Sequence, residues 1–381
     1  MPVTTGGQGP VTDVRQVYSG EMRPDAEVEA FEHASRLLPV RPVHRGGPVR
    51  ELPASARRLD NVVFSVGAQR YDLFDYLALN RVAGLLVLKD GAVVLEDYEL
   101  GHTASAYWPS FSIAKSVAST LVGAAIQDGL IAGLDALLTR YLPKLAGGGY
   151  DGVTVRQILQ MCSGVRWDET YTDPRSDRRQ VLDLQMSGRA GAVMEYLAAV
   201  RRAAAPGTVW NYNTGEIFVV GALLEAATQR PLAQYLTDKI WSRAGMEADA
   251  SWWTETPDGM GLAGTGLNAK LRDFGRFGLF VLDDGMLEGQ RVVPPGWFTE
   301  AGSAKVVGGN SVDYGFLWWP LPKGDPVHEG AFMAEGIFGQ YLYLNSRERL
   351  AIVVRSARPK PTGANIIPDA ALFAAVAKAL Q

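Results

Sequence analysis

The spacing of apolar residues divides the chain into an N-terminal arm, two strand-rich parts and a helical middle. Residues 1–60 are rich in Pro, Gly and Arg and show weak periodicity, so we expect an extended arm with one short helix in "DAEVEAFEHASRLL". The stretch "GLLVLKDGAVVLEDYEL" holds two short apolar runs joined at Asp90-Gly91, which predicts a β-hairpin. An apolar helix beginning near Ser112 follows the hairpin directly.

Residues 135–300 carry mostly helical spacing, as in "TVRQILQM", "GEIFVVGALLEAATQ" and "AKLRDFGRFGLFVLDD". Thr154 is expected to cap the first of these helices, and Pro231 fits the first turn of another. Strand patterns return in "FGQYLYLNSRERLAIVVRS", and an alanine-rich helix follows Pro368. This order predicts an α+β fold, in which an antiparallel sheet flanked by helices (residues 61–134 and 301–381) is interrupted by an all-α domain (135–300).

The composition of the chain argues against several classes of protein. The chain has 381 residues, 47% of them hydrophobic and 20% charged, which is typical of a globular protein. Its net charge of −4 argues against nucleic acid as a partner. Cys162 is the only cysteine, so an internal disulfide is excluded. The start has no apolar leader segment and no run of 18 apolar residues follows, so we expect a cytoplasmic protein, a monomer or homodimer, that does not bind membranes.

Several common catalytic solutions are missing from the sequence. The four histidines form no zinc-binding motif, and no G-x-S-x-G stretch is present, so we expect no metal and no cofactor. Residues 259–264 match G-x-G-x-x-G, but "TETPD" precedes them in place of an apolar strand. Without a βαβ unit around it, this match does not predict dinucleotide binding.

Ser112 and Lys115 form an S-x-x-K motif at the start of an apolar helix. One helical turn would bring the serine Oγ and the lysine amine onto the same face. Burial and the positive field of a helix N-terminus would disfavour the ammonium form, so that Lys115 could take a proton from Ser112. The alternative is an ordinary helix start with an exposed lysine, because the motif alone is weak.

Two further stretches could complete such a site. Tyr212 lies in a polar loop before an apolar helix, and near a lysine its phenol would be kept acidic and could pass a proton to a leaving group. In "AFMAEGIFGQYLYLN", Gly336 and Gly339 would let the backbone approach a ligand, with the N–H groups of Ile337 and Ser112 facing an oxyanion. Taken alone, the first stretch could equally place an aromatic side chain as a packing staple at the helix N-terminus. The second could be the start of a strand with no catalytic role.

Taken in this order, the three stretches resemble the serine β-lactamase and penicillin-binding-protein superfamily. The resemblance is closest to its class C-like branch, particularly the 6-aminohexanoate-dimer hydrolases and related esterases. The motifs S-x-x-K, Y-x-N and K-T-G correspond here to residues 112–115, 212–214 and 334–336, and "WDETYTDP", "LRDFGRFG" and "GIFGQ" also look like family landmarks. The resemblance implies a nucleophile at Ser112, a base at Lys115, a proton relay at Tyr212 and an oxyanion hole of the Ser112 and Ile337 N–H groups.

The resemblance also implies a cleft between the two domains that holds the substrate. The residues implied to line it are Tyr171, Trp318 or Trp319, and Gly336. For a substrate with a free amine, Asp183 and Glu169 are candidate anions, whereas Gly264 stands where the family would have a polar amide side chain.

The motifs depart from the family pattern at Thr214 and at Ala334, which replaces the lysine of K-T-G. Since that lysine helps to hold the carboxylate of β-lactams in the family, we expect a serine hydrolase that cleaves small amides or esters through an acyl-enzyme. A β-lactamase, a D-amino-acid peptidase and a penicillin-binding sensor without turnover are the alternatives.

Overall fold

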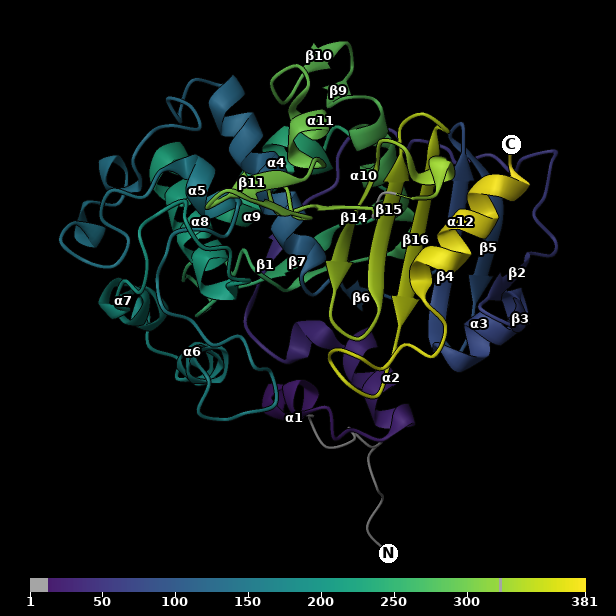
Figure 1. The fold of residues 1–381 in the computed structure, drawn as a ribbon, viewed down its shortest axis with the longest axis horizontal. Helices are drawn as coiled ribbons and strands as arrows, with labels where there is room; N and C mark the ends of the chain where they lie inside the picture. The colour runs from purple at the N-terminus through teal and green to yellow at the C-terminus, as the bar shows by residue number, and fades with distance from the viewer. Residues whose placement is uncertain (1–12, 322–323) are drawn as a thin grey trace, which may run out of the picture.

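A six-stranded antiparallel sheet forms the largest layer of the computed structural model, which describes residues 13–321 and 324–381 (Figure 1). The strand order is β13-β14-β15-β16-β4-β5. In that order the strands are Trp319–Pro320, Ala331–Gly336, Gln340–Asn345, Leu350–Ser356, Val82–Lys89 and Ala92–Tyr98. Asp90 and Gly91 join β4 to β5 with φ angles of 52° and 82°, as a type I′ turn requires, which confirms the predicted hairpin.

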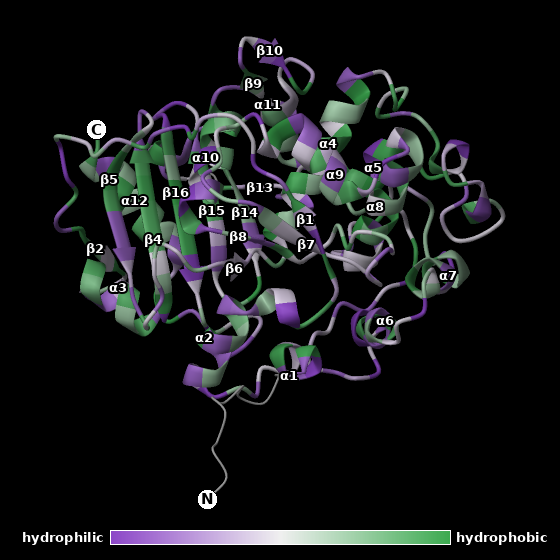
Figure 2. Cartoon of the chain, turned by 180° about the vertical axis from the view of Figure 1, so that it is seen from behind, coloured by the Kyte–Doolittle hydropathy of each residue, from purple (hydrophilic) through white to green (hydrophobic). Residues whose placement is uncertain are grey.

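Both faces of the sheet are buried, because its strands alternate two sets of apolar side chains. On β16, Leu350, Ile352 and Val354 face one apolar layer, whereas Ala351 and Val353 face the other. Helices α12 (Asp369–Ala379) and α3 (Leu73–Leu79) cover the first layer, and α10 (Leu271–Leu282) and α4 (Ile113–Gln127) cover the second. Figure 2 shows that β4 and β16 are hydrophobic along much of their length. The predicted α+β fold is confirmed.

The segment that was expected to be an N-terminal arm is folded onto the rest of the chain from residue 13 onward. Its predicted short helix is α2 (Pro24–Glu32), preceded by α1 (Val14–Ser19). Strand β1 (Val40–Val43) pairs antiparallel with β7 (Ala250–Trp253) in a second sheet of order β1-β7-β8-β6. The remaining strands of this sheet are β8 (Leu267–Ala269) and β6 (Trp108–Pro109). The first twelve residues of the predicted arm lie outside the described residues.

Beside the main sheet, the middle of the chain forms the helical part of the molecule (Figure 1). Its helices are α5 (Val155–Leu159), α6 (Asp177–Met186), α7 (Ala192–Ala199), α8 (Thr214–Thr228) and α9 (Leu232–Leu236). Thr154 caps α5 with a complete capping box, as predicted. Pro231 lies one position before the expected first turn, as the N-cap residue of α9.

The middle of the chain is not all-helical, however, since β7 and β8 lie within it. Both of these strands are nearly completely buried and too short to show an alternating pattern, so periodicity could not distinguish them from helix ends. Helix α10 also belongs to this part of the sequence but packs on β4, β15 and β16. The exact division into domains therefore stays a prediction.

The remaining strands and helices are short. They are β2 (Val63–Val66), β3 (Gln69–Asp72), β9 (Met286–Leu287), β10 (Gln290–Arg291), α11 (Trp297–Ala301), β11 (Lys305–Val307) and β12 (Asn310–Val312). In the described part of the chain, no helix combines the length and apolar character that crossing a membrane requires.

Candidate active site

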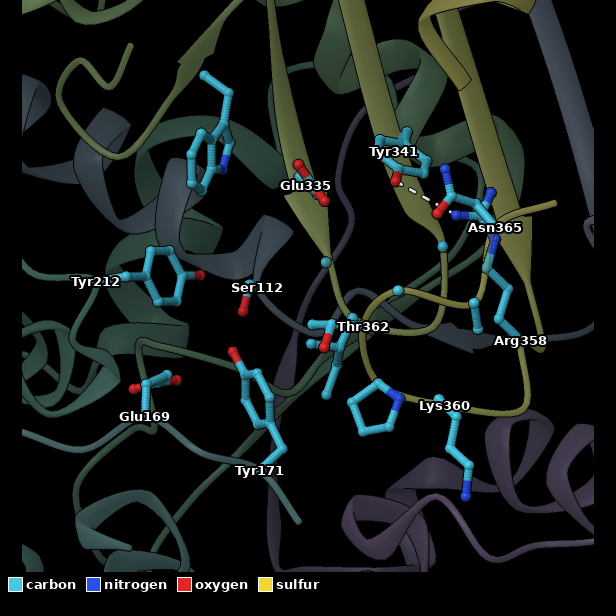
Figure 3. A pocket seen from close by; sticks show the side chains of 17 residues that line it. Ser112, Glu169, Tyr171, Tyr212, Glu335, Tyr341, Arg358, Lys360, Thr362 and Asn365 are labelled. Carbon is cyan, nitrogen blue, oxygen red and sulfur yellow. Dashed lines mark hydrogen bonds between the residues drawn. The ribbon is translucent and has the colours of Figure 1, made fainter. Parts of the chain in front are cut away.

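Ser112 lies at the start of α4, at the junction of the main sheet and the helical part. It is the N-cap residue of the helix, yet its side chain makes no capping hydrogen bond. The preceding residue, Phe111, has a φ of 43°, in the left-handed region that bulky residues rarely adopt. The chain therefore turns sharply before the helix, and the Ser112 Oγ faces a cavity (Figure 3).

Lys115 is buried beside Ser112, with 2% of its surface exposed. Its Nζ donates to the Ser112 Oγ at 2.7 Å and to the Gly264 carbonyl oxygen at 2.8 Å. Burial lowers the pKa of Lys115 from 10.5 to about 7, assisted by the positive charge of Arg178 and opposed by Glu169. An exposed lysine is thus excluded, and a substantial fraction of Lys115 is neutral near pH 7.

Tyr212 lies on the loop before α8, and its hydroxyl points toward Ser112 in Figure 3. Its ring centroid is 5.3 Å from the Lys115 Nζ, and the ring stacks on Trp319 with centroids 5.8 Å apart. The prediction of an acidified phenol was wrong. Burial, followed by the negative charge of Glu169, raises the pKa of Tyr212 well above 10, so the phenol is a neutral proton donor.

The end of β14 passes close to the backbone of Ser112. A Cβ atom on Gly336 would lie 2.6 Å from the Ser110 carbonyl oxygen and 3.1 Å from the Ser112 nitrogen, so only glycine fits there. Ile337 follows in the turn after β14 and lines the same cavity as Ser112. The close backbone approach expected from the glycines is therefore present at this point.

The cavity above Ser112 has a volume of about 360 Å³. Tyr171, Trp319 and Gly336 line it, as expected. Trp318 does not, because consecutive residues on an extended chain point in opposite directions. Its side chain is completely buried against Phe298 and Phe332, so assigning Trp318 to the cleft was wrong.

Of the two candidate anions, only Glu169 reaches the cavity. Asp183 is exposed on α6 and pairs with Arg15 at 2.6 Å, so the structure contradicts a role for it in the cleft. The Glu169 carboxylate accepts from the Thr214 backbone N–H at 2.9 Å and from the Thr214 hydroxyl. At Gly264 a Cβ would lie 2.9 Å from the Thr214 Cγ2, so this position contributes its carbonyl oxygen and leaves little room for a side chain.

The sequence patterns missed one wall of the cavity. Glu335 and Tyr341 lie on β14 and β15, and residues 358–365, which follow β16, complete that wall. Glu335 was visible in the third motif as the neighbour of Ala334, but no pattern marked its side chain as facing the cleft. Residues 358–365 carry no recognisable motif. They reach the cavity only through the path that the folded chain takes after β16.

Comparison with known proteins gives the class to which this fold and site belong. Residues 79–377 match the Beta-lactamase family model. This match shows that the chain belongs to the beta-lactamase family, and the family supports a general serine hydrolase activity.

The similar proteins include 6-aminohexanoate-dimer hydrolases and a carboxylesterase, alongside β-lactamases. The chain is 30% identical to a 6-aminohexanoate-dimer hydrolase from Paenarthrobacter ureafaciens over 352 residues, covering 87% of this chain and 86% of that protein. A solved structure from Bacillus anthracis, assigned as a 6-aminohexanoate-dimer hydrolase, superposes with a TM-score of 0.83 at 22% identity, covering 99% and 98% of the two chains. A family VIII carboxylesterase superposes with a TM-score of 0.60 at 19% identity, covering 81% and 96%. The similarity to these two structures shows the shared fold.

Proposed function

We propose that this hydrolase cleaves small amides or carboxylic esters through an acyl-enzyme on Ser112. The observation that carries the proposal is the 2.7 Å contact between the Ser112 Oγ and the Lys115 Nζ, together with the lowered pKa of that lysine. A neutral amine at this distance can remove the serine proton as the nucleophile attacks.

In the first half-reaction, the Ser112 hydroxyl gives its proton to Lys115 while Oγ bonds to the substrate carbonyl carbon. The N–H groups of Ser112 and Ile337 hold the resulting oxyanion, and each such donor contributes roughly 3–4 kcal/mol to transition-state stabilisation. Tyr212 protonates the leaving amine or alcohol as its bond to carbon breaks, and regains a proton from the Lys115 ammonium. In the second half-reaction, water replaces the leaving group and the same steps run in reverse.

Ala334 and the similarity to the Paenarthrobacter protein support an unstrained amide or ester as the substrate, with a 6-aminohexanoate oligomer as the leading candidate. A panel of p-nitrophenyl esters, aryl amides, 6-aminohexanoate dimer, a chromogenic cephalosporin and a D-Ala-D-Ala peptide tests this proposal. We expect turnover of esters or linear amides. Preferred turnover of the cephalosporin or the peptide, or a stable adduct without release, would favour one of the alternative activities.

The titration of Lys115 predicts a pH dependence. Because the base must be neutral, kcat/KM for a neutral ester should rise with pH through a midpoint of about 7, the pKa to which burial lowers Lys115. An initial-rate profile from about pH 5 to about pH 9 checks this. A profile that is flat between pH 6 and 8, or that falls with rising pH, would argue against a neutral lysine as the base.

The substitution Tyr212→Phe is expected to reduce kcat/KM more for amides than for activated esters. Amide cleavage needs a protonated leaving amine, whereas p-nitrophenolate leaves unaided, so we expect the variant to slow an anilide by about 10²-fold or more and a p-nitrophenyl ester much less. Paired kcat/KM values on one acyl group check the difference. Equal losses on both substrates would place Tyr212 outside the proton path.

A further inference from the structure

Glu335 brings an acidic side chain into the cleft beside the nucleophile. It follows Ala334 on β14 and immediately precedes Gly336, whose backbone lies against Ser112. In Figure 3 its carboxylate lies on the same side of the cavity as Tyr341, above Ser112. The negative charge of Glu335 also contributes to the raised pKa of Tyr212, so its field extends to the proposed proton donor.

Within residues 13–321 and 324–381, no Lys, Arg or His nitrogen lies within 4.0 Å of the Glu335 carboxylate. Its neighbour across the strands is Tyr341, a neutral group. Arg358 also lines the cavity, but both of its terminal nitrogens bind the Asp369 carboxylate, which offsets its charge. Burial raises the pKa of Glu335 to about 7, as expected for a carboxylate without a close cation.

The other cation of this wall, Lys360, lies at the rim of the cavity. Its ammonium donates to the Gly20 carbonyl oxygen at 2.7 Å and points away from Ser112 (Figure 3). The charge that faces the nucleophile from this wall is therefore that of Glu335. Glu169 adds a second carboxylate on the opposite side, where it holds Thr214.

Aromatic rings line the same cavity. Tyr212 and Trp319 form a stacked pair on one side, and Tyr341 lies beside Glu335. Tyr171 lines the cavity below Ser112 in the view of Figure 3. Aromatic faces attract alkylammonium groups through their quadrupoles, and they do so more strongly where water is excluded. A carboxylate and several rings around one cavity form a suitable environment for an organic cation and a poor one for a carboxylate.

We propose that Glu335 is a specificity-determining residue that selects substrates carrying an alkylammonium group near the scissile bond and rejects substrates carrying a carboxylate there. This inference rests on the proposed serine hydrolase function, and it identifies the charge class of its substrates. It assigns the recognition to the third motif, at the residue next to the missing lysine.

Three p-nitrophenyl esters of matched size test the proposal: one with a trimethylammonium group, one with a tert-butyl group in its place, and one with a carboxylate. Measured at about pH 8, where Glu335 is ionised, the wild-type kcat/KM should favour the cationic over the tert-butyl ester by roughly tenfold. The anionic ester should be disfavoured by a similar factor. In Glu335→Gln the ratio of cationic to tert-butyl ester should fall toward one, and the relative rate of the anionic ester should rise.

Glu329→Gln is the matched control, because Glu329 is exposed and pairs with Arg347 away from the cleft. It should leave both ratios unchanged. If Glu335→Gln turns over the esters with wild-type ratios, or if Glu169→Gln alone removes the preference, the assignment to Glu335 is overturned.

A pH titration of the wild-type preference keeps the proposal testable if Glu335→Gln does not fold. Because burial raises the pKa of Glu335 to about 7, the ratio of the cationic to the tert-butyl ester should fall toward one as the pH falls from about 8 to about 6. A ratio that does not depend on pH, or no preference at all, would contradict the proposal. Failure of the proposed function itself gives a different result, the absence of Ser112-dependent hydrolysis of all three esters.

Discussion

Replacing Ser112 with alanine is expected to lower kcat/KM for p-nitrophenyl acetate by about 10⁴- to 10⁶-fold, the loss seen when a hydrolase loses its nucleophile. The change removes the hydroxyl to which the Lys115 Nζ donates, and no other hydroxyl accepts from this Nζ in the described residues. Labelling by a serine-directed phosphonate should disappear together with the activity. Steady-state kinetics and intact mass spectrometry check the two results.

Ser119→Ala is the matched control for this experiment. Ser119 lies on the same helix α4 and is completely buried, but it does not line the cavity. The Ser119→Ala variant should keep its activity and should still be labelled by the phosphonate. If Ser112→Ala retained wild-type turnover while folded, as judged by circular dichroism, Ser112 could not be the nucleophile.

Lys115→Met is expected to have the second largest effect, a loss of about 10²- to 10⁴-fold in acylation, which is the usual contribution of a general base. Methionine fills a similar volume and cannot accept a proton. The single-turnover rate of p-nitrophenol release measures acylation directly. A variant that acylates at the wild-type rate would show that another group removes the serine proton.

The same variant should reveal the energetic cost of burying the lysine. Because the pKa of Lys115 falls from 10.5 in the unfolded chain to about 7 in the folded protein, the unfolded state binds more protons between these values. The wild type should therefore lose stability relative to Lys115→Met as the pH falls from about 10.5 to about 7, by on the order of a few kcal/mol. Urea unfolding at several pH values checks this. If the difference in unfolding free energy between the two proteins is constant over this range, the pKa of Lys115 is not lowered in the folded protein.

The parts of the fold that could be predicted from sequence are those specified by local patterns. The Asp90-Gly91 turn, the alternation in β15 and β16 and the capping residue Thr154 each depend on neighbours within a few positions. Strands β7 and β8 could not be found in this way, because they are short and buried on both faces. Only pairing with distant strands distinguishes them from ends of helices.

In the candidate site, too, some features could be predicted from the local sequence and others could not. Ser112 and Lys115 were recognisable because one helical turn fixes their separation, and Tyr212 because it lies in the polar loop just before a long apolar helix. The lining of the cavity depends on which side of a strand faces it, so Trp318 and Trp319 could not be distinguished beforehand. The Tyr212 pKa could not be predicted either, because its direction depends on burial and on the Glu169 charge, which only the folded chain places nearby.

A rapid-quench experiment with p-nitrophenyl acetate tests the central claim most directly. The account predicts a burst of about one p-nitrophenol per chain, with one acetyl group found by peptide mapping on Ser112 and on no other residue. The acetyl group should be absent from Ser112→Ala and should disappear from the wild type at the rate of steady-state turnover. Turnover without any acetyl on Ser112, or acetyl on another residue that is released at the turnover rate, would contradict the account.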